Sequence, residues 1–141
     1  ALRDVDMDML KASDLSETLL KRSAFVIEEN TRVHEMVKAL HEHDADRAGQ
    51  LLKASHAGLR HMYEVSCDEL DHLADFANRY EGVRGARMMG GGFGGCVICL
   101  LQQDVLDAFS IACVDSYLDR FGFEPEVILF ELAAGVGLAN E

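Results

Sequence analysis

Apolar residues recur at helical spacing over the first part of the chain. Between residues 15 and 40 they form one stripe, and favourable i, i+4 charge pairs lie on the polar side. This pattern predicts one long helix, or two joined by a bend. A second helix is predicted after Asp44, whose side chain can cap its start. The two apolar faces consist of Leu15, Leu19, Val26, Val33, Val37 and Leu40, and of Ala48, Leu51, Leu52, Ser55, Leu59 and Met62.

The third predicted helix has the clearest start signal in the sequence. Ser66, followed three residues later by Glu69, matches a capping box, and acidic residues in the first turn complement the helix dipole. Apolar positions continue to Tyr80, and Gly82 ends the helix.

The hydrophobic period changes from helical to alternating after Gly82. Two short β-type runs, at residues 83–89 and 96–102, flank a segment with five glycines in six positions. They predict an antiparallel hairpin whose loop is longer than a tight turn.

A fourth helix follows Asp104 and is closed by Gly122, and residues 126–132 predict a last strand. A helix-rich first half followed by strands and a further helix predicts the α+β class, with a small antiparallel sheet packed against several long helices. The length of 141 residues is that of one domain.

The charge of the chain excludes some partners. It has 25 acidic and 13 basic residues, a net charge of −12, and no lysine after Lys53. Because nucleic acids and anionic membrane surfaces are bound through clustered Lys and Arg, we predict neither as a partner. A nucleotide remains possible if main-chain amides, a metal ion or another domain supplies the counter-charge.

From the pattern of charged and apolar residues we expect neither a secretory signal nor a membrane-spanning segment. No charged segment followed by an apolar stretch opens the chain, and the longest apolar run, around residues 97–101, is too short to span a bilayer. A cytoplasmic location is therefore expected.

Four cysteines and six histidines are candidate metal ligands. Cys96 and Cys99 form a C-x-x-C pattern, but side chains three apart on a strand point to opposite faces, so we predict no metal site. We expect the cysteines to be reduced thiols in the core and the histidines to lie at the surface. The remaining members of these sets are Cys67, Cys113, His34, His41, His43, His56, His61 and His72.

The glycine-rich segment is the main candidate functional site. Glycine reaches positive φ without steric cost and leaves the backbone bare, so successive N–H groups can converge on a phosphate; the alternative is a loop chosen only for turn geometry. It is neither a Walker loop nor a Rossmann fingerprint. We expect Phe93 to be a hydrophobic anchor, with a ligand-facing role as the alternative. The candidate residues are Gly90, Gly91, Gly92, Phe93, Gly94 and Gly95.

Three separate stretches resemble one protein family. Gly85–Cys96 resembles the third conserved motif of the GHMP small-molecule kinases, most closely in the form found in galactokinases. Val26–Val33 and Ser55–Cys67 are similar to helical segments of galactokinases, the second ending in a Tyr-x-Val-Ser-Cys signature, and Leu2–Val5 also fits. The resemblance covers nearly the whole chain in order.

The resemblance implies a GHMP-kinase C-terminal domain over residues 1–141, with a ferredoxin-like antiparallel sheet. It implies a parent enzyme that transfers the γ-phosphoryl group of Mg-ATP to the anomeric hydroxyl of galactose. Gly90–Gly95 would then lie beside the ATP phosphates at the domain interface. ATP and Mg²⁺ would be bound mainly by an N-terminal domain in cis. That domain would also hold the sugar-binding residues and the catalytic aspartate, so this chain alone is expected to be inactive.

Arg87 and Met89 could support the loop, and Met89 and Val136 depart from the family pattern. Arg87 could point at phosphate or pair with an acidic group, and we favour the pair. Met89 stands where galactokinases usually have a small hydroxyl residue, and Val136 replaces a residue that is often polar. These departures leave open a non-catalytic, ligand-binding or regulatory relative, or a kinase for another sugar. A purely structural role, with the helices as a dimerisation surface, has no specific support.

Overall fold

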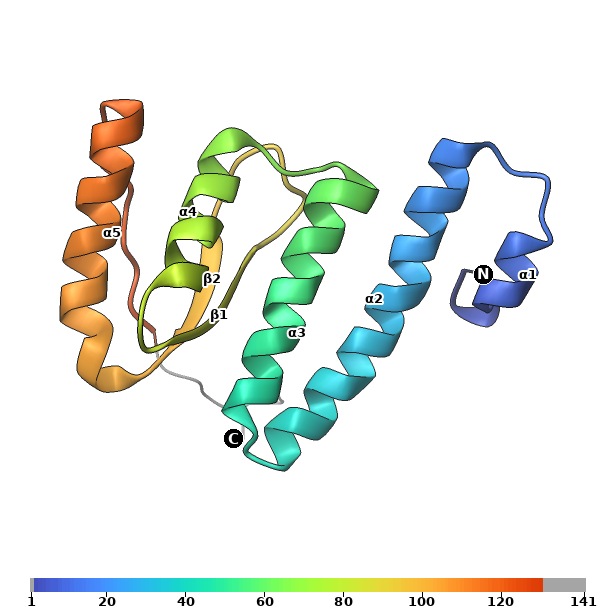
Figure 1. Ribbon diagram of the computed structural model, residues 1–141, viewed down its shortest axis with the longest axis horizontal. Helices are drawn as coiled ribbons and strands as arrows, with labels where there is room; N and C mark the ends of the chain where they lie inside the picture. The colour runs from blue at the N-terminus through green and yellow to red at the C-terminus, as the bar shows by residue number, and fades with distance from the viewer. Residues whose placement is uncertain (1, 131–141) are drawn as a thin grey trace, which may run out of the picture.

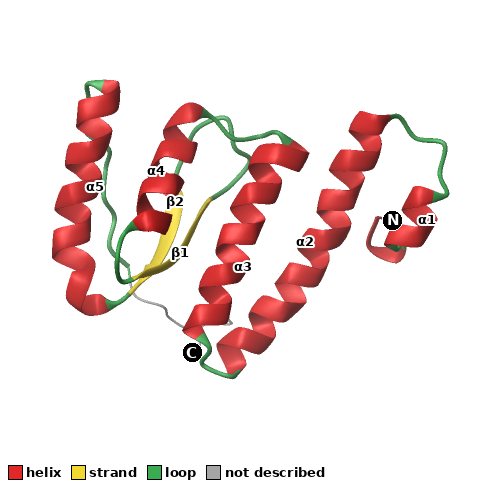
Figure 2. Cartoon of the chain, in the orientation of Figure 1, coloured by secondary structure: helices red, strands yellow, loops and turns green. Residues whose placement is uncertain are grey.

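Helices lie on both sides of a two-stranded hairpin in the computed structural model, which describes residues 2–130 (Figure 1). Strands β1 (Val83–Met88) and β2 (Val97–Leu101) pair antiparallel, and Figure 2 shows them in yellow among the helices. Helices α2 and α3 lie on one side of the hairpin, and α4 and α5 on the other. The predicted α+β class is confirmed. In chain order the helical elements are η1 (Leu2–Asp4), α1 (Met7–Lys11), α2 (Glu17–His41), α3 (Ala45–Gly58), η2 (Leu59–Tyr63), α4 (Asp68–Arg79), η3 (Gln103–Val105) and α5 (Leu106–Phe121).

The apolar stripe of residues 15–40 lies on one continuous helix, α2, with Leu15 just before its start. The helix buries Phe25 and Ala39, and Val26 is the stripe residue that packs against the core. The other stripe residues have exposed fractions between 41% and 55%. The pattern therefore predicted the helix correctly, but most of its apolar stripe is not covered by the described part of the chain.

Helix α3 crosses β1 where both backbones carry glycine. A Cβ added to Gly49 would lie 2.3 Å from the carbonyl oxygen of Arg84, and one added to Gly85 would lie 2.1 Å from that of Gly49. Because no side chain fits between the two backbones, glycine is required at both positions. This close approach fixes β1, and with it the start of the glycine loop, against α3.

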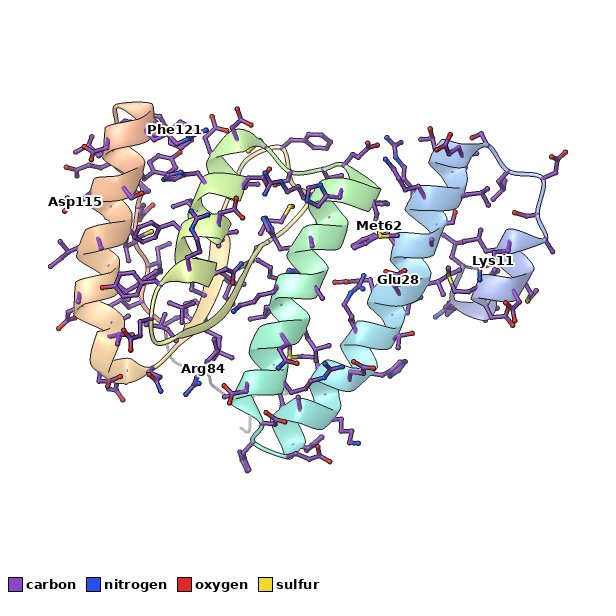
Figure 3. The ribbon with its side chains drawn as sticks, viewed as in Figure 1. Lys11, Glu28, Met62, Arg84, Asp115 and Phe121 are labelled. Atoms are coloured by element: carbon purple, nitrogen blue, oxygen red, sulfur yellow. The ribbon has the colours of Figure 1, made fainter. Side chains whose placement is uncertain are left out.

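The predicted second helix changes geometry before it ends. Asp44 Oδ1 accepts the N–H of Arg47 at 2.9 Å, which confirms the cap. The α-helix stops at Gly58, and the chain continues through the π-helical turn η2 to Glu64, whose φ is +60°. Met62, in this turn, lies between α3 and α2 (Figure 3) and packs against the core.

The predicted capping box at α4 is wrong. The N-cap residue is Cys67, and its side chain makes no capping hydrogen bond. The Ser66 hydroxyl instead donates to Asp71 Oδ1 at 2.5 Å. The helix still runs as expected to Arg79, and Asn78 binds both the N–H and the carbonyl oxygen of Ala86 in β1. Tertiary contacts of Ser66 therefore replace the local cap.

The predicted hairpin is confirmed. Met88 pairs with Val97, and the N–H of Met89 donates to the carbonyl oxygen of Cys96 at 2.9 Å, which closes the base of the loop. Within residues 2–130 the sheet has these two strands and no others.

The last predicted strand is not formed in its described part. Helix α5 ends at Gly122 as expected, with φ +79°. Residues 126–130 have no strand structure, and Val127–Phe130 are exposed. Among residues 2–130 the sheet consists of β1 and β2, so no described strand pairs with this segment. Residues 131 and 132, and Val136, lie outside the described residues.

The core consists of small clusters around the hairpin. Phe25, Leu59, Leu70 and Met88 join α2, η2, α4 and the end of β1. A second cluster, Ala77, Val83, Ala86 and Phe109, joins α4, β1 and α5. The glycine loop therefore begins two residues after a fully buried residue, Met88. No helix in the described range is long and apolar enough to cross a membrane.

Candidate functional site

The loop Gly90–Gly95 connects the two strands with an unusual backbone. The φ angles of Gly90, Gly92, Gly94 and Gly95 are +73°, +84°, +133° and +100°, and that of Phe93 is +59°. Side chains disfavour such angles, so the glycines are required by conformation. Runs of such conformations can form concave nests of main-chain N–H groups, which bind anions.

The inner side of the loop is fixed by the segment between η2 and α4. The N–H of Phe93 donates to the carbonyl oxygen of Val65 at 2.7 Å. A Cβ on Gly92 would lie 2.0 Å from the same oxygen and 2.9 Å from Cε of Met88. The loop backbone is thus pressed against Val65, inside the Tyr-x-Val-Ser-Cys stretch.

The outer side of the loop is bare. A Cβ added to Gly90, Gly91, Gly94 or Gly95 would meet no atom within 4 Å. The main chain at these positions is therefore open to a ligand or to another part of the protein.

Phe93 does not anchor the loop with its ring. The ring is 76% exposed, so the predicted hydrophobic anchor is wrong for the described residues. The anchor is the main-chain N–H of Phe93, and no hydropathy pattern can report a main-chain contact.

Arg87 and Met89 lie at the root of the loop. Arg87 pairs with Glu29 Oε1 at 3.1 Å, and its Nε donates to the carbonyl oxygen of Met88 at 2.9 Å. The ion pair with an acidic group is the one expected from the sequence. Met89 closes the loop base through its N–H, and its side chain is 45% exposed.

The Glu29 carboxylate accepts hydrogen bonds from side chains of three elements, α2, α3 and β1. The sequence pattern did not predict this role. The carboxylate accepts from Ser55 Oγ at 2.5 Å and from Arg32 Nε at 2.7 Å, besides Arg87. The contacts tie α2 to α3 and β1 behind the loop. Ser55 lies on the apolar face predicted for this helix, and a hydroxyl at such a position is the signal in the sequence for a buried partner.

His56 is buried, contrary to the surface position expected for the histidines. It is 4% exposed, and its Nδ1 accepts the N–H of Met88 at 3.3 Å. Its Nε2 lies 3.4 Å from Asp71 Oδ1. Burial lowers the pKa of His56 below 6.5, against the opposing attraction of Asp71 and Asp75. The signal in the sequence was its spacing, four residues after Leu52 and three before Leu59.

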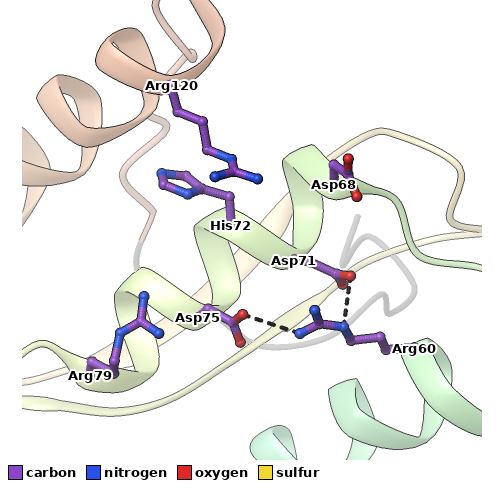
Figure 4. Close-up of a pocket in the computed structure, with 7 residues that line it drawn as sticks. All are labelled: Arg60, Asp68, Asp71, His72, Asp75, Arg79 and Arg120. Atoms are coloured by element: carbon purple, nitrogen blue, oxygen red, sulfur yellow. Dashed lines mark hydrogen bonds and ion pairs between the residues drawn. The ribbon is translucent and has the colours of Figure 1, made fainter.

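Asp71 is shared by several donors and borders a shallow pocket of about 190 Å³ on α4. Arg60 bridges Asp71 and Asp75, at 2.8 Å and 3.1 Å (Figure 4). Arg79 and Arg120 also line the pocket, together with Asp68 and His72. Because its arginines and aspartates balance, the pocket has no net charge to select an ion.

The cysteines are free thiols with different exposures. Burial raises the pKa of Cys99 to about 12, and burial also raises that of Cys113. Both are therefore protonated at neutral pH. Cys96 is exposed, so its predicted core position is wrong. Among residues 2–130, no three His, Cys, Asp or Glu side chains form a possible metal site.

Comparison with known proteins shows which family has these features. The family model "GHMP kinases C terminal" matches residues 36–115, which include the loop. The galactokinase of Thermosipho africanus is 41% identical over 136 residues, covering 96% of this chain and 38% of the relative. That of Thermotoga maritima is 45% identical over 124 residues, covering 88% of this chain and 35% of the relative.

A solved structure agrees. The crystal structure of Lactococcus lactis galactokinase complexed with galactose matches with a TM-score of 0.82 at 38% identity, covering 88% of this chain and 33% of that chain. The fold is thus an α+β domain of the kind found at the C-terminus of small-molecule kinases. The chain belongs to the GHMP kinase family. It spans a little over a third of the length of the relatives it matches.

Proposed function

We propose that this chain is the C-terminal part of a galactokinase that transfers the γ-phosphoryl group of Mg-ATP to the anomeric hydroxyl of galactose, giving galactose 1-phosphate. The observation that carries the proposal is the similarity to galactokinases over up to 96% of the chain. The contribution of this chain is the loop Gly90–Gly95, which approaches the ATP phosphates with its main-chain N–H groups.

The geometry of the loop is compatible with that role. Its inner side is held by Val65, and its outer side has no covering atoms at four glycines. Phosphoryl transfer depends on positioning and on charge stabilisation, and fixed N–H dipoles supply both without a cation. Arg87 is already paired with Glu29, so it acts behind the loop and not on phosphate.

Mg²⁺ in this proposal is held by the nucleotide and by other parts of the protein. Mg²⁺ prefers carboxylates and phosphate oxygens, and the described residues contain no cluster of acidic ligands at the loop. When bound, the ion neutralises charge on the transferring group. This chain provides main-chain donors beside it.

The catalytic base and the sugar-binding residues belong, in this proposal, to an N-terminal domain in cis. Two observations support it. The chain covers 35% to 38% of its relatives, and α2 presents Leu19, Val33, Val37 and Leu40 to solvent on one side. An apolar stripe on a chain with a net charge of −12 is typical of a covered interface.

A different acceptor sugar and a non-catalytic role are the alternatives. Met89 favours them, since its thioether cannot replace a hydroxyl donor, although the loop closure at Cys96 uses only its main chain. The four free thiols support a reducing, cytoplasmic location for the protein.

The test is ADP release by the full-length protein with Mg-ATP and a panel of sugars. We expect release that depends on galactose, and no turnover above background from residues 1–141 alone. Release with another sugar and not with galactose would contradict the acceptor, and no sugar-dependent release would favour the non-catalytic relative. Turnover by the isolated chain would contradict the assignment of catalysis to the rest of the protein.

A further inference from the structure

His56 is placed where an apolar side chain would be expected. It comes from α3, is 4% exposed, and lies among residues that join α3, α4 and β1. A buried polar ring destabilises the fold unless its nitrogens face partners. Nδ1 of His56 has a hydrogen-bond partner, whereas Nε2 makes no hydrogen bond and only lies near a carboxylate. The two neighbours lead to different parts of the glycine loop.

The first partner is the end of β1. Nδ1 accepts the N–H of Met88 at 3.3 Å, one residue before the loop base. Because Nδ1 acts as acceptor, the ring carries its proton on Nε2. This contact holds the entrance of the loop against α3.

The second neighbour is Asp71 on α4: Nε2 of His56 lies 3.4 Å from its Oδ1 but makes no hydrogen bond there. The same carboxylate oxygen accepts the Ser66 hydroxyl at 2.5 Å. Ser66 follows Val65, whose carbonyl oxygen accepts the N–H of Phe93 at 2.7 Å. Asp71 is therefore connected, through Ser66 and Val65, to Phe93 in the middle of the loop.

We infer that His56 is a positioning residue for the glycine loop. It binds Met88 at the loop entrance through a hydrogen bond and lies in contact with Asp71. From Asp71 the path continues through Ser66 and Val65 to Phe93, and it closes a circuit with the loop itself. The inference rests on the proposed function for its kinetic consequence, but the positioning itself does not depend on which ligand the loop binds.

Burial favours the neutral ring that the circuit needs, against the pull of two nearby carboxylates. Asp71 and Asp75 face His56 from α4, Arg60 from η2 and Arg87 from β1, so opposite charges partly cancel. Burial then sets the balance and lowers the pKa. The neutral ring is the form that can accept the Met88 N–H, since a protonated imidazole has no acceptor.

Hydrogen exchange in the full-length protein without ligand tests the circuit. His56→Asn keeps an acceptor near the position of Nδ1, His56→Gln places its amide near Nε2, and His56→Leu keeps neither. We expect the Met88 amide to exchange about tenfold faster in the Gln and Leu variants and to stay near wild type in Asn, as loss of one hydrogen bond predicts. Equal exchange in all three variants would overturn the inference.

Two further variants separate positioning from general destabilisation. Ser66→Ala leaves His56 in place, so Phe93 should exchange faster while Met88 does not. Leu51→Ala removes a buried side chain from the cluster of α2 and α3, away from the loop. The two variants are compared at the same loss of melting temperature. If Leu51→Ala then raises amide hydrogen exchange in residues 88–95 as much as His56→Leu does, His56 is only a core residue and the inference fails.

Kinetics then distinguish this inference from the proposed function. We expect KM for ATP, measured with galactose, to rise about tenfold in His56→Leu and His56→Gln and little in His56→Asn, with a smaller change in kcat. Faster exchange with an unchanged KM would support the positioning role and contradict the phosphate role of the loop. Unchanged exchange overturns the positioning role whatever the kinetics.

Discussion

Helices α2 and α4 lie on opposite sides of the hairpin and distribute their residues in opposite ways (Figure 1). Helix α4 buries Leu70, Ala74 and Ala77, as an amphipathic surface helix should. Helix α2 turns a polar network centred on Glu29 inward and leaves much of its apolar stripe in solvent. An apolar helix face thus indicates a surface that is buried in the whole protein, but the residues that bury it need not belong to the same stretch of chain.

The largest difference should appear in stability. Leu70→Ala removes a side chain that is 1% exposed and should destabilise the chain by about 3 to 4 kcal/mol. Val37→Ala, on the exposed stripe, should cost less than about 0.5 kcal/mol in residues 1–141. Urea denaturation of both variants measures this. In the full-length protein the cost of Val37→Ala should rise to about 1 kcal/mol. Similar costs for the two variants in the 141-residue chain would remove the contrast between the helices.

The glycine loop offers a matched pair of variants, one on the side that packs against Val65 and one on the open side. Gly92→Ala would drive a Cβ into the Val65 carbonyl at a positive φ, whereas Gly91→Ala meets open space. In the full-length enzyme we expect Gly92→Ala to lower kcat/KM for ATP about a hundredfold, because misplaced positioning groups lose most of their effect. Gly91→Ala should change it less than about fivefold. Steady-state assays decide, and equal losses would mean that Val65 does not position the loop.

The inward face of α2 can be tested with two neighbouring carboxylates. Glu29→Gln leaves Arg32 and Arg87 without their common anion and should destabilise the protein by about 2 kcal/mol. Glu28→Gln removes a partly exposed pair with Arg32 and should cost less than about 1 kcal/mol. Thermal unfolding of the two variants gives the comparison. If Glu28→Gln costs as much, the inward network is not the reason why this helix packs as it does.

The smallest effect expected is a pH dependence from His56. Its folded pKa is lowered by burial, so below about pH 6.5 the unfolded state binds more protons. Stability should therefore fall as pH decreases through this range, with a slope of at most about 1.4 kcal/mol per pH unit for one proton. His56→Asn should flatten this slope in urea denaturation between about pH 7 and about pH 5.5. An unchanged slope would show that His56 is not the titrating group.

The local pattern was sufficient for most elements. Helical spacing and the glycine run predicted α2, α4, α5 and the hairpin, because the apolar positions and the punctuation at Gly82 and Gly122 are local properties. The last strand could not be predicted in the same way, since residues 126–130 have the right composition but pair with no strand in the part of the chain that the structure describes. Pairing is a tertiary property that composition does not contain.

The loop was predictable in position, but its supports were not. Consecutive glycines mark the loop in the sequence, whereas its anchor is a main-chain contact to Val65 and has no side-chain signature. Ser66 and His56 were misplaced because local rules favour a helix cap and a surface histidine. Each instead has its partner, Asp71 or Met88, on another element.

The most direct test of the account is a crystal structure of the full-length protein with a non-hydrolysable ATP analogue. We expect main-chain N–H groups of Gly90–Gly95 to lie within hydrogen-bond distance, about 3 Å, of the phosphate oxygens, with the Phe93 N–H still on Val65. Phosphates bound elsewhere, with the open side of this loop in solvent or covered only by protein, would contradict the account.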